Sequence, residues 1–192
     1  MLRVRVTRYS VPALYRRSSV SRHTTPRNKE EYVDLFSIEL LILSVVYLFL
    51  VSYGRSKPDL IHLVIPNFLQ DCNDRNPLIR ALAIRTMSYI PIPVVTEALT
   101  DNLRHALKDR DPYVRKTAAI CVAKLYAADP RKAEKEGFVE LLRDLMLDSN
   151  ATVVANAVAA LSEIGDRQDG VIFKLNLTTA NKLLAALTES SE

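Results

Sequence analysis

A short motif occurs three times in this chain of 192 residues. It reads D-R-N-P-L-I-R-A-L-A from Asp74, D-R-D-P-Y-V-R-K-T-A from Asp109 and D-S-N-A-T-V-V-A-N-A from Asp148. The three aspartates lie 35 and 39 residues apart. A period of this length is typical of supersecondary units that bury their apolar faces by stacking on one another.

The beginning of the motif predicts the start of a helix. Pro77 and Pro112 suit the first helical turn, where the N–H that proline lacks would be unpaired in any case. Asn76, Asp111 and Asn150 stand just before that turn and are favourable N-cap residues. The leading aspartates place a carboxylate near the positive end of each helix.

Later positions predict how each helix packs. An Ile or Val begins the buried stripe, and an Ala about one turn later allows close approach of another helix. These residues are Ile79, Val114 and Val153, followed by Ala83, Ala118 and Ala157. Arg80 and Arg115 can reach an aspartate in their own or a neighbouring repeat, whereas the third copy has Val154 there.

The motif helices are expected to alternate with second helices. The predicted pairs are 77–89 with 94–108, 112–127 with 138–147, and 150–164 with 178–190, preceded by 40–53 with Pro58–Cys72. Pro66 is expected to kink or shorten the last of these helices. No run alternates polar and apolar residues between turn signals. The predicted fold class is all-α, an α-solenoid of HEAT/armadillo-like helix pairs, over a domain of residues 32–192.

Basic charge is concentrated before this domain. Residues 1–31 contain eight basic and two acidic side chains, so the rest of the chain, with 18 basic and 20 acidic ones, is slightly negative. The repeats therefore have no overall basic charge that would support binding of nucleic acid. The leader is expected to be disordered. It fits a mitochondrial transit peptide, a basic leader without an address, or a mispredicted exon.

Residues 35–53 are apolar enough to raise a second possibility, a transmembrane segment. Glu39 interrupts the stretch, at a cost of about 2.5–3.5 kcal/mol at mid-bilayer. A helix buried within the repeat array explains the same composition. A membrane-anchored repeat protein remains the alternative.

Several segments resemble the β subunits (β-adaptins) of heterotetrameric clathrin adaptor complexes. The resemblance covers about residues 45–190 and is carried by V-V-Y-L-F-L-V-S-Y at 45–53, S-K-P-D-L at 56–60, D-R-N-P-L-I-R-A-L-A-I-R-T-M at 74–87, D-P-Y-V-R-K-T-A-A at 111–119, F-V-E-L-L-R-D-L at 138–145, V-V-A-N-A-V-A-A-L-S-E-I at 153–164 and N-K-L-L-A-A-L at 181–187. The segments at 111–119 and 153–164 are the most specific to the family.

The resemblance implies a non-catalytic scaffold of an adaptor coat, acting in intracellular and vesicle-mediated protein transport. The implied partners are a second large adaptin and the medium and small subunits, with an Arf-family GTPase and a phosphoinositide membrane surface as further partners. The implied location is cytoplasmic, peripheral on coated vesicles of the Golgi, endosomes or plasma membrane. The chain resembles only an early part of the family trunk and shows no clathrin-box motif, so direct clathrin binding is not implied.

The sequence gives no sign of catalytic or cofactor chemistry. No nucleotide-binding glycine motif or nucleophile-elbow motif occurs, so we expect no enzyme and no cofactor. His23, His62 and His105 lie far apart and lack partners at metal-ligand spacing, so we expect no metal. Cys72 and Cys121 are isolated and are expected to be reduced thiols.

Two groups of side chains are candidates for contact with partners. On the helix from Pro58 the resemblance suggests a GTPase contact through Ile61, His62 and Ile65. The alternative, which the stacking of repeats favours, is that these residues face the next repeat. Around one inter-helix turn, basic side chains can meet an acidic partner or a phosphoinositide headgroup, or form a solvated edge balanced by nearby acids. They are Arg104, Lys108, Arg110, Arg115 and Lys116.

Overall fold

The computed structural model describes residues 29–167 and Asn181, and the regular elements within them are all helical. The elements are α2 (Lys29–Tyr53), the short 3-10 helix η1 (Gly54–Ser56), α3 (Pro58–Asp71), α4 (Pro77–Ser88), α5 (Pro93–Ala106), α6 (Pro112–Ala128), α7 (Pro130–Lys135), α8 (Phe138–Leu145) and α9 (Ala151–Arg167). The predicted all-α fold is confirmed.

The chain divides into two compact units, Met1–Leu50 and Val51–Glu192. The described part of the first unit is the long helix α2 up to Leu50, and the last three residues of the predicted leader begin this helix. Among the described residues, which include 35–53, no helix combines the length and the apolar character needed to cross a membrane.

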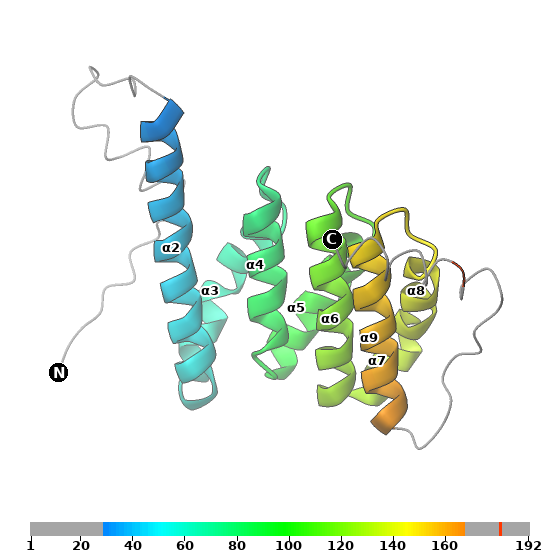
Figure 1. Cartoon of the computed structure of the whole chain (residues 1–192). Coiled ribbons are helices and arrows are strands. Elements are labelled where there is room, and N and C mark those ends of the chain that lie inside the picture. The colour runs from blue at the N-terminus through cyan, green and yellow to red at the C-terminus, as the bar shows by residue number, and fades with distance from the viewer. Residues whose placement is uncertain (1–28, 168–180, 182–192) are drawn as a thin grey trace. The chain divides into compact units, whose positions relative to one another are not determined.

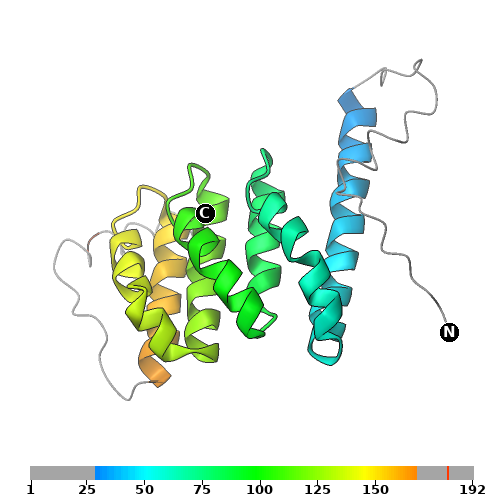
Figure 2. The same ribbon diagram turned by 180° about the vertical axis from the view of Figure 1, so that it is seen from behind.

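The second unit is built of two layers of helices. Figure 1 shows α4, α6 and α9 side by side, and Figure 2 shows from behind that α3, α5 and α8 form the other layer. Within the first layer α6 packs against both α4 and α9. This alternation between layers is the arrangement expected of a helical solenoid.

The predicted N-caps are confirmed in all three repeats. The side-chain oxygen of Asn76 accepts a hydrogen bond from the backbone N–H of Leu78 at 3.0 Å, and that of Asp111 accepts one from Tyr113 at 2.8 Å. Asn150 accepts the N–H of Thr152 at 3.0 Å in the same way. Each motif therefore starts a helix by its own local chemistry.

The structure differs from the sequence analysis at two places. Pro66, which was expected to kink or shorten its helix, does not shorten α3, which continues through it to Asp71. The sequence reasoning also missed α7, which begins with the N-cap Asp129, whose side chain accepts the N–H of Lys132 at 3.0 Å. The predicted helix 178–190 lies outside the described residues apart from Asn181.

Small residues hold the first layer together. Ala83 in α4, Ala118 in α6 and Ala157 in α9 are fully buried, as the motif predicted. Val114 and Val153 are buried beside them, while Ile79 is half-buried. A methyl group at these positions lets neighbouring helices approach closely, which fixes the distance between successive repeats.

Candidate interaction site between successive repeats

The leading aspartate of each motif shapes the turn before the helix. Asp74, Asp109 and Asp148 each accept the backbone N–H of the residue two positions later, at 2.7, 2.9 and 2.8 Å respectively. The N-cap residue then accepts the next N–H, so two side chains that are two residues apart satisfy N–H groups at the start of each helix.

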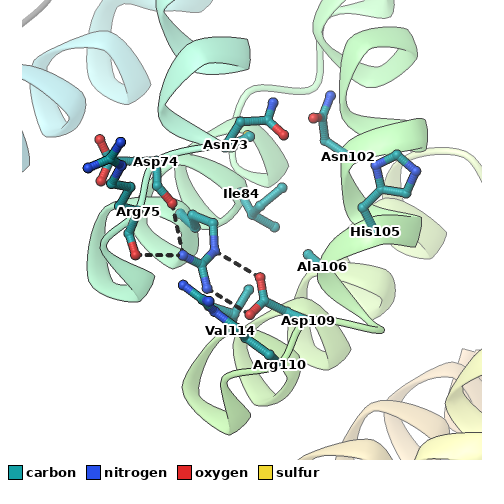
Figure 3. A pocket seen from close by; sticks show the side chains of 12 residues that line it. Asn73, Asp74, Arg75, Ile84, Asn102, His105, Ala106, Asp109, Arg110 and Val114 are labelled. Atoms are coloured by element: carbon teal, nitrogen blue, oxygen red, sulfur yellow. Dashed lines mark hydrogen bonds and ion pairs between the residues drawn. The ribbon is translucent and has the colours of Figure 1, made fainter.

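Arg80 joins one repeat to the next. Its Nε and Nη2 donate to the two carboxylate oxygens of Asp109 at 2.8 and 2.7 Å, and its Nη1 donates to the carbonyls of Asp74 and Arg75 at 2.8 and 3.1 Å (Figure 3). The guanidinium thus contacts both its own turn and the turn of the following repeat. Such a two-point pair fixes orientation as well as distance.

Arg115 repeats this arrangement one step further along the solenoid. Its Nε and Nη2 donate to the carboxylate of Asp148 at 2.7 and 2.9 Å, while its Nη1 donates to the carbonyls of Asp109 and Arg110 at 2.7 and 3.1 Å. The third copy has the buried Val154 at this position. Of the two partners considered from sequence, the carboxylate is therefore that of the neighbouring repeat, and the turn of the same repeat supplies carbonyls.

The arginine pairs change the titration of the aspartates. Burial by itself would raise the pKa of Asp109, but hydrogen bonds from Arg80 and from the N–H of Asp111 outweigh it and hold the pKa below its ordinary value. The pKa of Asp148 is lowered in the same way by Arg115 and the N–H of Asn150. Both carboxylates are therefore ionised throughout the neutral range.

Acid is expected to weaken the fold through these two carboxylates. A group with a lowered folded-state pKa stabilises the protein above its unfolded pKa, near 3.9 for Asp, and this contribution is lost as the pH falls through the folded value. Urea unfolding at pH 7 and pH 3 should show a larger loss for the native chain than for the Asp109→Asn/Asp148→Asn variant. Equal losses would mean that other groups govern acid sensitivity.

A cavity of about 440 Å³ lies beside the Arg80–Asp109 pair. The loop before α4 contributes Asn73 and Arg75, α5 contributes Asn102 and His105, and the turn before α6 contributes Arg110 (Figure 3). Arg75, His105 and Arg110 are exposed. We call this space the inter-repeat cavity. The exposed Arg75 and Arg110 lie beside a nearly buried ion pair in which Arg80 and Asp109 already neutralise each other.

The structure disperses the basic residues predicted around one turn. Arg110 lines the inter-repeat cavity and Lys108 is exposed, whereas Arg115 is engaged with Asp148. Arg104 donates to the carbonyl and carboxylate of Glu136 at 3.0 and 2.9 Å and lies over the ring of Phe138. Lys116 lies over the ring of Tyr113, at 4.8 Å from its centroid, and lines a different cavity.

The three residues predicted on α3 differ in exposure. Ile61 is fully buried, His62 is exposed and Ile65 is half-buried. Only His62 and Ile65 offer surface to a partner, so the proposed contact on this helix depends on them.

The sequence reasoning missed Arg75 and His105 as members of a site. A signal for Arg75 was present, because Arg75 and Arg110 occupy the second position of successive motifs. Stacked repeats place equivalent positions along the same edge. His105 carried no such signal, because it lies on a second helix outside the motif.

The described residues show neither a cluster of metal ligands nor a reactive thiol. Among them, no three His, Cys, Asp or Glu side chains are grouped so that they could hold a metal ion. Burial, reinforced by the charge of Asp71, raises the pKa of Cys72 to about 12. Burial raises the pKa of Cys121 to about 11. Both thiols stay protonated near neutral pH, which makes them poor nucleophiles.

Comparison with known proteins gives two kinds of match. Residues 78–192 match the family model described as non-SMC mitotic condensation complex subunit 1. The chain is 51% identical over 153 residues to AP-1 complex subunit beta of Dictyostelium discoideum and 51% identical over 154 residues to AP-1 complex subunit beta-1 of Homo sapiens. It is 37% identical over 156 residues to AP-2 complex subunit beta of Schizosaccharomyces pombe.

These matches cover most of the chain but a small part of the relatives. The alignments with the two AP-1 subunits include 80% of this chain and 16% of each of those proteins, and the AP-2 alignment includes 81% and 23%. Because the chain spans less than a quarter of each of these relatives, the matches by themselves do not assign the activities of the whole relatives to this chain.

Proposed function

Because this chain belongs to the β-adaptins and to the helical-repeat family of the matched condensation-subunit model, we propose that it is a non-catalytic scaffold subunit of a clathrin adaptor coat. It acts in vesicle-mediated protein transport through protein contacts along its solenoid. The observation that carries this proposal is the 51% identity to AP-1 beta subunits over 80% of the chain. The condensation-subunit match reflects the shared helical repeat, so that protein's role is not carried over.

The proposed partners are a second large adaptin together with a medium and a small subunit. The proposed location is peripheral, on coated vesicles of the Golgi, endosomes or plasma membrane. The Arg80–Asp109 and Arg115–Asp148 pairs support this role, because they fix the relative position of successive repeats and so the surface that partners meet.

Affinity purification of the tagged chain from its own cells, followed by mass spectrometry, tests the proposal. We expect a second large adaptin, a medium subunit and a small subunit among the recovered proteins. The matched control is a tagged chain carrying Ala118→Leu, which should disturb the first layer and reduce recovery. Recovery of none of these subunits with the native chain would contradict the proposal.

A more specific proposal concerns α3 and an Arf-family GTPase. His62 is exposed and Ile65 is half-buried at i, i+3 spacing, so both lie on one face of the helix. A mixed apolar and polar face of this kind suits a transient protein contact. Ile61 is unsuitable for a test, because its burial means that a charge there would unfold the helix layer.

Replacing His62 by Glu and Ile65 by Asp is expected to weaken binding of the GTP-loaded GTPase at least about tenfold, since two central contacts are lost. A pull-down with immobilised GTPase measures the change, and circular dichroism checks that helicity is retained. The control is Asn67→Asp on the same helix, at an exposed position. Unchanged binding by the His62/Ile65 variant would discard this contact.

A second specific proposal assigns a phosphoinositide headgroup to the inter-repeat cavity. Arg75, His105 and Arg110 offer exposed nitrogen donors around a space of about 440 Å³, and Arg80 beside them is already paired. Arginines suit phosphate because their planar groups can donate two hydrogen bonds at once. The attraction should weaken as salt screens the charges.

Reversal of both arginine charges, in Arg75→Glu/Arg110→Glu, is expected to reduce binding to vesicles containing phosphatidylinositol 4-phosphate by about tenfold or more. Flotation of vesicles with and without this lipid measures binding. Arg131→Glu/Lys135→Glu makes the same change of charge on exposed positions of α7 and should have little effect. Equal binding by both variants would reject the cavity as the headgroup site.

A further inference from the structure

A second cavity lies on the first layer of helices, which is formed by α4, α6 and α9. It has a volume of about 410 Å³ and is lined by the second half of α4, by one side of α6 and by Asn156 of α9. Figure 1 shows these three helices side by side. We call this space the α4–α6 groove.

Positive charge lines the α4–α6 groove. Arg85 of α4 and Lys116 and Lys124 of α6 are among its lining residues, and none of the lining residues is an aspartate or a glutamate. Lys124 donates to Glu163 of α9 at 3.2 Å. Within the described part of the chain, neither Arg85 nor Lys116 has a carboxylate within salt-bridge distance, so two cations face the groove uncompensated.

Large apolar side chains also line the groove and remain exposed. Tyr89 is 44% exposed, Tyr113 is 40% exposed and Ile120 is 41% exposed. Lys116 lies over the ring of Tyr113, with Nζ 4.8 Å from the ring centroid. Apolar and aromatic surface beside cations suits a ligand that has an apolar side chain and negative charge together.

Ser88 and Cys121, which also line the groove, provide no reactive nucleophile. The hydroxyl of Ser88 donates to the carbonyl of Arg85 at 2.7 Å and lies 3.3 Å from the Cys121 sulfur. Burial raises the pKa of Cys121 to about 11, against the opposing influence of Ser88, Arg85 and Lys124. The thiol is therefore neutral, and the groove is suited to binding rather than to covalent chemistry.

From this combination we propose that the α4–α6 groove docks an acidic segment of a partner protein that carries an aromatic or aliphatic anchor residue. The carboxylates meet Arg85 and Lys116, and the anchor packs against Tyr113 and Ile120. Charge complementarity selects this occupant, since Arg85 and Lys116 are uncompensated. The exposed rings and Ile120 give a bare phosphate nothing to contact. The inference does not depend on the adaptor function, because it rests on the lining of the groove alone.

Fluorescence anisotropy of the full chain with a labelled peptide tests this inference. The probe is a short peptide with a Tyr-Leu pair flanked by glutamates. Two comparison peptides replace either the glutamates by glutamines or the Tyr-Leu pair by glycines. We expect binding of the first peptide, with at least about tenfold weaker binding of each comparison peptide. Equal affinity for the glycine peptide would overturn the proposal, because it would mean attraction by charge alone.

Matched variants locate the binding. Arg85→Glu/Lys116→Glu should weaken binding of the first peptide by about tenfold or more, whereas Arg131→Glu/Lys135→Glu, with the same change of charge outside the groove, should not. Tyr113→Ala/Ile120→Ala removes the anchor contacts without changing charge and should weaken binding severalfold. Circular dichroism checks folding of each pair, and the uncharged pair decides the question if the charge reversal unfolds the chain.

Three further outcomes also overturn the proposal. They are no binding of the first peptide by the native chain, equal binding by the groove variants and the control variant, and binding of anionic vesicles through Arg85 and Lys116 without binding of the peptide. None of them affects the adaptor proposal, which is tested by the subunits recovered with the tagged chain.

Discussion

Replacing Arg80 by methionine is expected to lower the free energy of unfolding by about 3–5 kcal/mol. The Arg80 and Asp109 side chains are only 10% and 13% exposed, so the variant leaves a carboxylate in a nearly buried place without its cation. The carbonyls of Asp74 and Arg75 lose a donor as well. Urea unfolding followed by circular dichroism measures the change.

The control for this prediction is an ion pair on the surface. Arg143 lies 3.6 Å from Glu140, and their side chains are 45% and 64% exposed. Arg143→Met should cost no more than about 1 kcal/mol, since water screens exposed pairs. Losses of similar size for Arg80→Met and Arg143→Met would show that the inter-repeat pair contributes little.

A double-mutant cycle separates the pair from its surroundings. Adding Asp109→Asn to Arg80→Met removes the stranded charge, and the double variant should be more stable than the sum of the single losses implies. The coupling should exceed about 1 kcal/mol for residues in direct contact. Simple additivity would assign the loss to the carbonyl contacts of Arg80 rather than to its pair with Asp109.

Enlarging Ala118 to leucine is the second change with a large expected effect, a loss of about 1–3 kcal/mol in the free energy of unfolding. Ala118 is fully buried in α6, the helix that packs against both α4 and α9. Additional methyl groups there must push a neighbouring helix away or force strained rotamers. Thermal and urea unfolding measure the loss.

Ala127 provides a matched control on the same helix. It is exposed near the end of α6, so Ala127→Leu should change the free energy of unfolding by less than about 0.5 kcal/mol. If Ala118→Leu were equally harmless, the alanine of the motif would not be needed for close approach of the helices.

Local chemistry explains why the helix starts were predictable. Asn76, Asp111 and Asn150 satisfy N–H groups within two or three residues of themselves, so the pattern alone fixes these bonds. The short helix α7 shows the limit of this reasoning. Its Asp129 cap and Pro130 were as visible as the others, but a helix of six residues is too short to show an apolar period.

The inter-repeat cavity was predictable only in part. Arg75 and Arg110 share a motif position, so stacking alone brings them to one edge. His105 and Asn102 join them from α5, whose sequence lies outside the motif. Their approach depends on how the second layer packs against the first, and no spacing along the chain encodes that distance.

The candidate basic cluster illustrates the same limit. Arg104, Arg110 and Lys116 lie close together in the sequence, but they have different neighbours in the fold. Arg104 meets Glu136, which is 32 residues away, while Lys116 lines the α4–α6 groove. Arg104 lies on α5, Arg110 on the turn that follows it and Lys116 on α6, so residues that are near in sequence belong to different elements with different neighbours.

The sequence by itself determined that the chain is all-α, that it repeats, where the motif helices begin, and which family it resembles. These features depend on interactions within a few residues or on a repeated pattern. Only the tertiary structure decided that Arg80 and Arg115 bind the carboxylate of the following repeat, that Ile61 is buried beside an exposed His62, and that cations line the α4–α6 groove. Those features depend on packing between helices that are far apart in the chain, where small shifts change which groups meet.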